Sequence, residues 1–174
     1  MTMLYLIRHA ETYFNVWHKV QGWCDSPLTP RGIEQAKSVR RYFEEDHIKF
    51  ASAYSSTSER ACDTLELITH HKMNYKRLKD LREWGFGSFE GQDERLNPKV
   101  PYEDFFVQYG GESQRQLQER IFSCIDKIMK GADLEDKVLI VSHAGAIYNF
   151  LKMIAVDVDK VRQVGYGNCG ILKI

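Results

Sequence analysis

The sequence has no excess of charge of either sign. Its 174 residues contain 24 lysines and arginines and 24 aspartates and glutamates, so the formal net charge is zero. A neutral chain has no long-range field that would gather nucleic acid or an anionic membrane. We therefore expect neither as a partner, and any anion binding must depend on local groups of side chains.

Cysteines are few and widely spaced. The four, Cys24, Cys62, Cys124 and Cys169, form no Cys-x-x-Cys pair. Neither a disulfide framework nor a zinc site is indicated, and we expect buried or unreactive thiols and no bound metal.

Long apolar runs are also missing. The apolar start of the chain has no basic leader and reaches Arg8-His9 too soon for a signal peptide or a membrane span. The composition, 43% hydrophobic and 28% charged, suits a globular chain with a core. We expect a cytoplasmic protein that folds as one domain over residues 1–174.

Strand and helix patterns alternate along the chain. Apolar runs predict a buried strand over Leu4–Ile7, a weaker one over Ala51–Ser55, the clearest over Lys137–Val141 and a final edge strand over Cys169–Ile174. Strands that alternate with helices predict an α/β fold: a three-layer sandwich with a mostly parallel central sheet flanked by helices.

Four helices are predicted from apolar stripes at helical spacing. Thr29-Pro30 and the pair Ser113 and Gln116 are typical helix starts, and Ser55–Ser58 is a candidate start for a third helix. The stripes are Ile33, Ala36, Val39 and Phe43; Ala61, Leu65 and Ile68; Leu117, Ile121, Ile125 and Ile128; and Ile147, Leu151 and Ile154. Residues 80–111 contain five glycines and two prolines and show no sustained period, apart from a candidate short helix over Tyr102–Val107. Such stretches often form lids or binding loops.

Two histidines follow the two clearest internal strands. His9 and His143 both stand where a predicted strand ends, which is the edge of a parallel sheet where ligands bind. One such histidine is most often a packing or surface residue, but two at matching ends favour a site. Neutral imidazole is a nucleophile, and Arg8 beside His9 offers paired hydrogen bonds to phosphoryl oxygens.

A phosphoryl group in transfer spreads its charge over several oxygens and needs several donors. Arg60, His143 and Asn15 are candidates, and Arg60 would lie in the first turn of a helix, where backbone N–H groups attract anions. Glu83 lies in an aromatic-rich loop that would take the carboxyl out of water and keep it protonated for a leaving-group oxygen. A plain loop glutamate paired with Arg82 is the alternative.

These residues stand in stretches that resemble the histidine phosphatase superfamily, in its phosphoglycerate mutase-like branch. The resemblance covers Leu6–Thr12, Asn15 and Gln21–Gly32, and it continues in order over nearly the whole chain. The later stretches are Tyr54–Thr64, Glu83 with Gly91, Gly110–Ser113 and Val141–Gly145. Ala10 replaces the glycine of the family's best-known form, as in many members.

The resemblance implies roles for these residues. His9 would accept the phosphate, Arg8, Arg60 and His143 would clamp it, and Glu83 would act as general acid and then as base. Asn15, Gln21, Gly22 and the backbone of Ala144 would complete the pocket. Only a short loop separates Glu83 from Gly111, where cofactor-dependent mutases of the family carry a longer insertion. A small open lid favours hydrolysis, because a mutase must keep water out while its intermediate reorients.

The leading hypothesis is therefore a metal-independent phosphatase without a cofactor, monomeric or homodimeric, that acts on a small phosphorylated metabolite. A cofactor-dependent phosphoglycerate mutase, a phosphohistidine protein phosphatase and a non-catalytic phosphate or nucleotide sensor remain open. A sensor would not need all five catalytic groups, and a metal-dependent hydrolase would need closely spaced ligand pairs. Most aromatic residues near the site should be packing, with two or three covering an apolar part of the substrate. These residues are Trp23, Trp84, Phe86, Phe89, Tyr102, Phe105, Phe106 and Tyr109.

Overall fold

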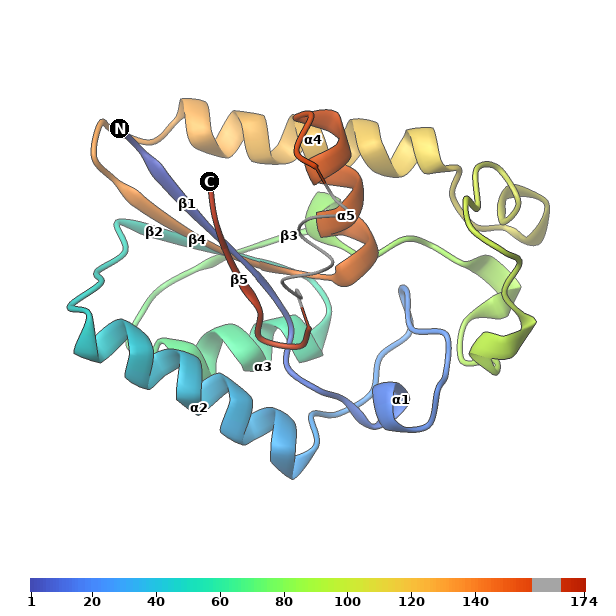
Figure 1. Cartoon of the computed structure of the whole chain (residues 1–174), viewed down its shortest axis with the longest axis horizontal. Helices are drawn as coiled ribbons and strands as arrows, with labels where there is room; N and C mark the ends of the chain where they lie inside the picture. The colour runs from blue at the N-terminus through green and yellow to red at the C-terminus, as the bar shows by residue number, and fades with distance from the viewer. Residues whose placement is uncertain (158–166) are drawn as a thin grey trace.

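A computed structural model describes residues 1–157 and 167–174 of the chain. Its strands form one sheet in the order β3-β2-β4-β1-β5 (Figure 1). The strands are β1 (Met3–Arg8), β2 (Ser52–Ser56), β3 (Lys76–Leu78), β4 (Lys137–Ser142) and β5 (Ile171–Lys173). The first four run parallel and β5 runs antiparallel to β1 at the edge. The predicted mostly parallel sheet with a final edge strand is confirmed.

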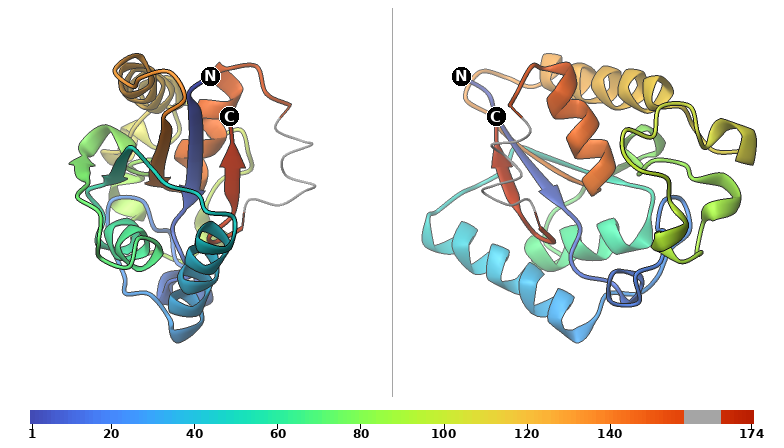
Figure 2. Two further views of the ribbon diagram at one scale, coloured as in Figure 1. Left: turned by 90° about the vertical axis from the view of Figure 1, so that its left-hand side faces the viewer. Right: turned by 45° about the vertical axis from the view of Figure 1, so that its right-hand side comes forward.

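Helices cover both faces of this sheet (Figure 2). The helices α2 (Pro30–Glu45) and α3 (Glu59–Ile68) lie on one face, and α4 (Gln114–Lys130) and α5 (Ala144–Met153) lie on the other. A one-turn helix, α1 (Tyr13–Val16), follows β1. None of the helices within residues 1–157 and 167–174 is long and apolar enough to cross a membrane.

The two helical layers close two separate hydrophobic cores. Leu4 and Leu6 of β1 pack toward α4 and α5, whereas Tyr5 and Ile7 pack toward α2 and α3. Alternate residues of a strand point to opposite faces, so a strand covered on both sides must be apolar throughout. This is why β1 and β4 give the clearest strand patterns in the sequence.

Two of the predicted helix starts are confirmed by their caps. The Thr29 hydroxyl accepts a hydrogen bond from Gly32 N at 2.9 Å before Pro30 opens α2. At α4, Ser113 and Gln116 cap each other reciprocally. At α3, Ser58 is the N-cap residue, but its side chain makes no capping hydrogen bond.

Gly32 also sets how closely α2 approaches the loop after His9. A Cβ atom at this position would stand 2.1 Å from the carbonyl oxygen of Glu11. Only glycine allows that approach without a shift of backbone.

Residues 79–111 form the irregular stretch that the glycines and prolines predict. It contains short 3-10 helices at Lys79–Leu81, Gly87–Phe89, Glu94–Leu96 and Val107–Tyr109. The predicted helix over Tyr102–Val107 is wrong: residues 103–106 are turns, and Glu103 takes a left-handed φ of 45°. Side-chain packing explains the conformation of this stretch, because Phe106 is fully buried and five aromatic rings pack edge-on against it.

Candidate active site

The parallel pair β1 and β4 brings the two histidines together. Arg8 is in register with Ser142, so His9 and His143 leave the same edge of the sheet, and His9 N donates to Ser142 O at 2.9 Å. The ring centroids are 5.2 Å apart. Both side chains are buried, at 4% and 0% exposure. Matching strand ends thus bring the two histidines close together, and their shared role in one site stays a prediction.

A single hydrogen bond fixes the tautomer of His9. Its Nδ1 lies 2.8 Å from the carbonyl oxygen of Ala10. A carbonyl only accepts, so Nδ1 carries the proton and Nε2 keeps a lone pair. Burial, and after it the charges of Arg60 and Arg8, lower the pKa of His9 well below its ordinary value. The imidazole is therefore neutral at neutral pH, the form that can act as a nucleophile.

His143 has the opposite tautomer. Its Nδ1 accepts from Arg60 Nη2 at 3.0 Å, and its Nε2 lies 2.7 Å from Ser56 Oγ. Because a guanidinium only donates, the proton of the neutral ring is on Nε2, directed at Ser56. Burial, and after it Arg60, also lowers the pKa of His143 well below its ordinary value. Both rings are thus uncharged beside two arginines.

Arg60 is fully buried at 0% exposure. Its Nη1 donates to Asp25 Oδ1 and to the Cys24 carbonyl, both at 2.9 Å, and its Nη2 donates to the Gly22 carbonyl at 2.8 Å. The terminal nitrogens are thereby held by the loop of residues 21–25. Its Nε is a buried donor with no hydrogen-bond partner in the described parts of the chain.

Glu83 is buried, at 7% exposure, against the N-terminus of α5. Its Oε2 accepts from Gly145 N at 2.9 Å, and its Oε1 accepts from Ala146 N at 2.9 Å and from Trp84 N at 2.8 Å. The burial expected from the aromatic loop is present. The alternative pairing is not, because Arg82 donates to Thr57 Oγ1 at 2.5 Å instead.

Six of the nine predicted site residues line a cavity of about 150 Å³. Its lining includes Arg8, His9, Asn15, Gln21, Glu83 and Ala144. Gly22, Arg60 and His143 are not part of this lining, so the direct contact of Arg60 and His143 with phosphate stays a prediction. The side-chain Oε1 of Gln21 accepts from Thr12 Oγ1 at 2.8 Å, while its Nε2 is a second buried donor without a partner among the described residues. Such orphaned donors are costly unless a ligand satisfies them.

Gly22 lies away from this lining. Its N–H donates to Glu90 Oε2 at 3.0 Å, and its carbonyl accepts from Arg60. The structure therefore shows Gly22 in contact with Arg60, and its predicted direct contact with the substrate stays a prediction.

Two residues that touch the site escaped the sequence patterns. Ser56 holds His143, and Asn168 Nδ2 donates to the His9 carbonyl at 3.0 Å and to Asn15 Oδ1 at 3.2 Å. A lone Asn near the end of the chain carries no signal. Ser56 lies within a stretch that carries the family resemblance, where attention to strand ends would have found it.

Two carboxylates brace the loops that carry the site. Glu90 accepts four backbone N–H groups, from Gly22, Trp23, Cys24 and Phe86. Glu112 forms a paired ion bridge with Arg120, whose guanidinium also donates to the carbonyls of residues 80, 82 and 83.

A metal centre has no support in the described parts of the chain. No group of three or more histidine, cysteine, aspartate or glutamate side chains in residues 1–157 and 167–174 is placed to hold an ion. The side chains described above supply two neutral imidazoles, two guanidinium groups and one carboxyl.

Comparisons with known proteins agree with this geometry. The profile of the histidine phosphatase superfamily (branch 1) matches residues 4–174. The chain is 30% identical over 160 residues to a metal-independent phosphoserine phosphatase of Arabidopsis thaliana, covering 84% of this chain and 66% of the relative. It is similar to a crystal structure of phosphoglycerate mutase from Bacillus anthracis, with a TM-score of 0.86, 30% identity and coverage of 99% of this chain and 87% of the other. A phosphoserine phosphatase of Entamoeba histolytica, solved with 3-phosphoglyceric acid, gives a TM-score of 0.79 at 28% identity over 99% of this chain and 90% of the other.

Proposed function

The chain belongs to the histidine phosphatase superfamily, and from this premise we propose that it is a phosphomonoester phosphatase that works through a phosphohistidine on His9. The observation that carries the proposal is the state of His9. Its imidazole is neutral, and the proton is on Nδ1, so the lone pair of Nε2 can attack phosphorus. The ring lines a cavity together with Arg8 and Glu83. That is the arrangement a nucleophile for phosphorus requires.

In the first step the phosphoryl group of the ester enters this cavity. Its oxygens meet Arg8, the orphaned Gln21 Nε2 and the N–H of Ala144, since Glu83 already uses the next two N–H groups of α5. His9 Nε2 attacks phosphorus, the bond from phosphorus to the ester oxygen breaks, and the departing oxygen takes a proton from Glu83. The electron pair leaves with the alcohol.

The second step returns the enzyme to its first state. A water molecule attacks the phosphorus of phospho-His9 and gives its proton to the Glu83 carboxylate. The nitrogen–phosphorus bond breaks, inorganic phosphate leaves, and Glu83 holds the proton for the next cycle. Arg60 and the neutral His143 lie outside the lining of the cavity and stay hydrogen-bonded to each other through both steps.

Hydrolysis is favoured over mutase chemistry by the short stretch after Glu83. A mutase must hold a second phosphate, and the described residues that line the cavity add Lys19 as the single further cation. The relatives named as phosphoserine phosphatases support a small phosphorylated metabolite as the substrate class.

Phosphoglycerate mutase is the second candidate because of the similarity to the Bacillus anthracis structure. A coupled mutase assay with and without a bisphosphate primer separates the two, since a mutase should need the primer. Primer-dependent interconversion faster than phosphate release would replace the phosphatase proposal.

The direct test replaces the nucleophile. His9→Asn should lower the hydrolysis of p-nitrophenyl phosphate by about a thousandfold or more. The matched control is His47→Asn, because His47 is exposed and has a left-handed φ of 52°, which asparagine tolerates. Rapid acid-free quenching with labelled ester should trap an alkali-stable phosphoenzyme in the wild type only. A fully active His9→Asn protein would refute the proposal.

Metal independence is tested separately. Hydrolysis by the purified protein should be unchanged after dialysis against EDTA. A loss of activity that added zinc or magnesium restores would show that the reaction uses a metal ion.

A further inference from the structure

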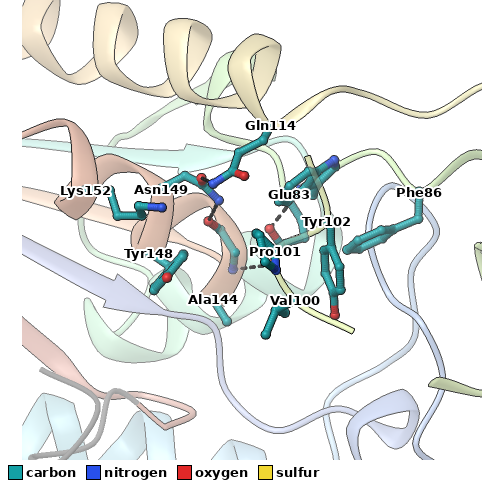
Figure 3. Close-up of a pocket in the computed structure, with 12 residues that line it drawn as sticks. Glu83, Phe86, Val100, Pro101, Tyr102, Gln114, Ala144, Tyr148, Asn149 and Lys152 are labelled. Atoms are coloured by element: carbon teal, nitrogen blue, oxygen red, sulfur yellow. Dashed lines mark hydrogen bonds between the residues drawn. The ribbon is translucent and has the colours of Figure 1, made fainter. Parts of the chain in front are cut away.

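A second and larger cavity, of about 390 Å³, opens beside the catalytic one (Figure 3). The two share Glu83, Phe86 and Ala144 in their linings. Glu83 is the residue that would protonate the leaving oxygen, so the second cavity begins where the alcohol part of an ester would leave the phosphate. Its position is that of a leaving-group pocket.

One wall of this pocket is a single face of α5. Ala144, Tyr148 and Lys152 are spaced by four residues and therefore lie in a row along the helix. At about 1.5 Å of rise per residue, the row runs about 12 Å outward from Ala144 to Lys152. Figure 3 shows these side chains on one side of the pocket, with Val100, Tyr102 and Phe86 on the other.

The opposite wall is apolar and built from flat side chains. The rings of Trp84 and Phe86 are stacked at 6.2 Å with an angle of 17° between their planes, and Tyr102 meets Trp84 edge-on at 5.5 Å. Val100 and Pro101 also line the pocket. Walls of this kind suit a flat apolar body.

Lys152 is the polar group that can bind the end of a ligand furthest from its phosphate. The amide of Asn149 is occupied, since its oxygen accepts from Gln114 and Gln118 and its nitrogen donates to the Gly145 carbonyl. Lys152 is exposed, lies 5.7 Å from the centroid of the Tyr148 ring, and pairs with no carboxylate in the described parts of the chain. Its ammonium charge is available to an anion.

We propose that this pocket selects phosphate esters whose alcohol has a flat apolar body and a carboxylate about 10 to 12 Å from phosphorus, bound by Lys152. The proposal rests on the proposed phosphatase function. Serine is too short for this pocket: its carboxylate lies a few bonds from the ester oxygen and cannot reach Lys152. Free phosphoserine should therefore be a poor substrate compared with an aryl phosphate that carries a distant carboxylate.

The test uses two esters that differ only at the far end. One is the phosphate ester of 3-(4-hydroxyphenyl)propanoate, and the other is the same ester of its amide. Their phenols have nearly equal acidity, because two methylene groups insulate the ring, so a rate difference reports binding. We expect the wild type to prefer the carboxylate in kcat/KM by about two- to fivefold, as for an exposed ion pair.

Substitutions at Lys152 should remove this preference or reverse it. Lys152→Gln should bring the ratio of the two kcat/KM values to about one, and Lys152→Glu should favour the amide. Lys72→Gln is the control, because it makes the same change of charge at an exposed residue beyond the far end of α3. It should keep the wild-type ratio.

The outcomes separate the two proposals. Equal ratios in the wild type and in Lys152→Gln, with both esters hydrolysed, would overturn the pocket and leave the phosphatase function intact. If no ester is hydrolysed the phosphatase function fails, and calorimetry on the His9→Asn protein still decides the pocket. Binding of the carboxylate ester two- to fivefold tighter than the amide supports the pocket, and equal affinities overturn it.

Discussion

A methyl group at residue 145 should displace the proposed acid without unfolding the protein. A Cβ at Gly145 would stand 2.6 Å from Glu83 Oε1, against an ordinary contact of 3.4 Å or more. In Gly145→Ala the carboxylate must therefore withdraw by about 0.4 to 0.8 Å, depending on how tight a contact survives. Misplacement of a reacting group by about 1 Å can cost a hundredfold in rate. We expect kcat for alkyl phosphates to fall by about ten- to hundredfold.

The same substitution should leave stability nearly unchanged. The obstructing atoms are the far end of a side chain, which can move, and alanine gains up to about 1 kcal/mol of helix propensity over glycine. Gly131→Ala is the matched control, because a Cβ there meets the carbonyls of Lys127 and Ile128 at 3.5 and 3.6 Å, which is ordinary contact. It should change neither the rate nor the urea midpoint.

A series of phosphate esters with progressively less acidic alcohols distinguishes loss of the acid from general damage. Glu83 matters most when the leaving oxygen is strongly basic, so the plot of log kcat against alcohol pKa should steepen in Gly145→Ala. Adding Gly145→Ala to Glu83→Gln should cost little more, since the acid is already lost. An equal fall for every ester, or full rates with alkyl phosphates, would refute the role assigned to Glu83.

Three further predictions concern the buried histidines and the carboxylates of Glu112 and Glu90. Burial and Arg60 lower the pKa of both His9 and His143. The stability that these neutral rings contribute is therefore present above about pH 6.5 and is lost as the pH falls below it. The melting temperature should fall on acidification, and it should fall less in His143→Gln. Arg120→Met breaks the partly buried pair with Glu112 at 2.7 Å and should cost about 2 to 3 kcal/mol in urea unfolding, whereas Arg115→Met, at a 3.9 Å surface pair, should cost little. In Glu90→Gln an NH₂ group faces backbone N–H donors that bind a carboxylate oxygen in the wild type. The substitution should weaken the binding of vanadate by about tenfold in isothermal titration. The exposed control Glu119→Gln should bind vanadate as the wild type does.

The layout of the fold could be predicted because local pattern and burial agree over its main elements. In β1 and β4 both faces are covered, so the apolar runs mark the strands directly. The caps Thr29 and Ser113 also act within their own turns. The two site histidines could be placed for the same reason, since strand ends locate them without any knowledge of distant contacts.

Prediction failed where long-range contacts decide the conformation. The segment Tyr102–Val107 has a helical pattern, but its aromatic side chains pack against aromatic rings of residues 84–89. The hydrogen-bond donors that hold Glu83 at α5 could not be predicted either, because they are backbone N–H groups of residues about sixty positions further along the chain. Backbone donors leave no trace in residue type. The predicted extent of one domain, 1–174, stays a prediction.

The geometry divides phosphate recognition from alcohol recognition between different elements. The two histidines come from the ends of β1 and β4, and hydrogen bonds fix their rings: His9 bonds to the Ala10 carbonyl, and His143 bonds to Ser56 and to Arg60 of α3. The leaving-group pocket is built instead from the outer face of α5 and the 100–102 segment, and it meets the catalytic cavity at Glu83, Phe86 and Ala144. Substitutions at Val100 or Lys152 therefore change which alcohol fits while leaving the tautomers of both histidines, and with them the chemistry, as they are. On these proposals the second set of residues selects the alcohol, and the first set carries out the reaction.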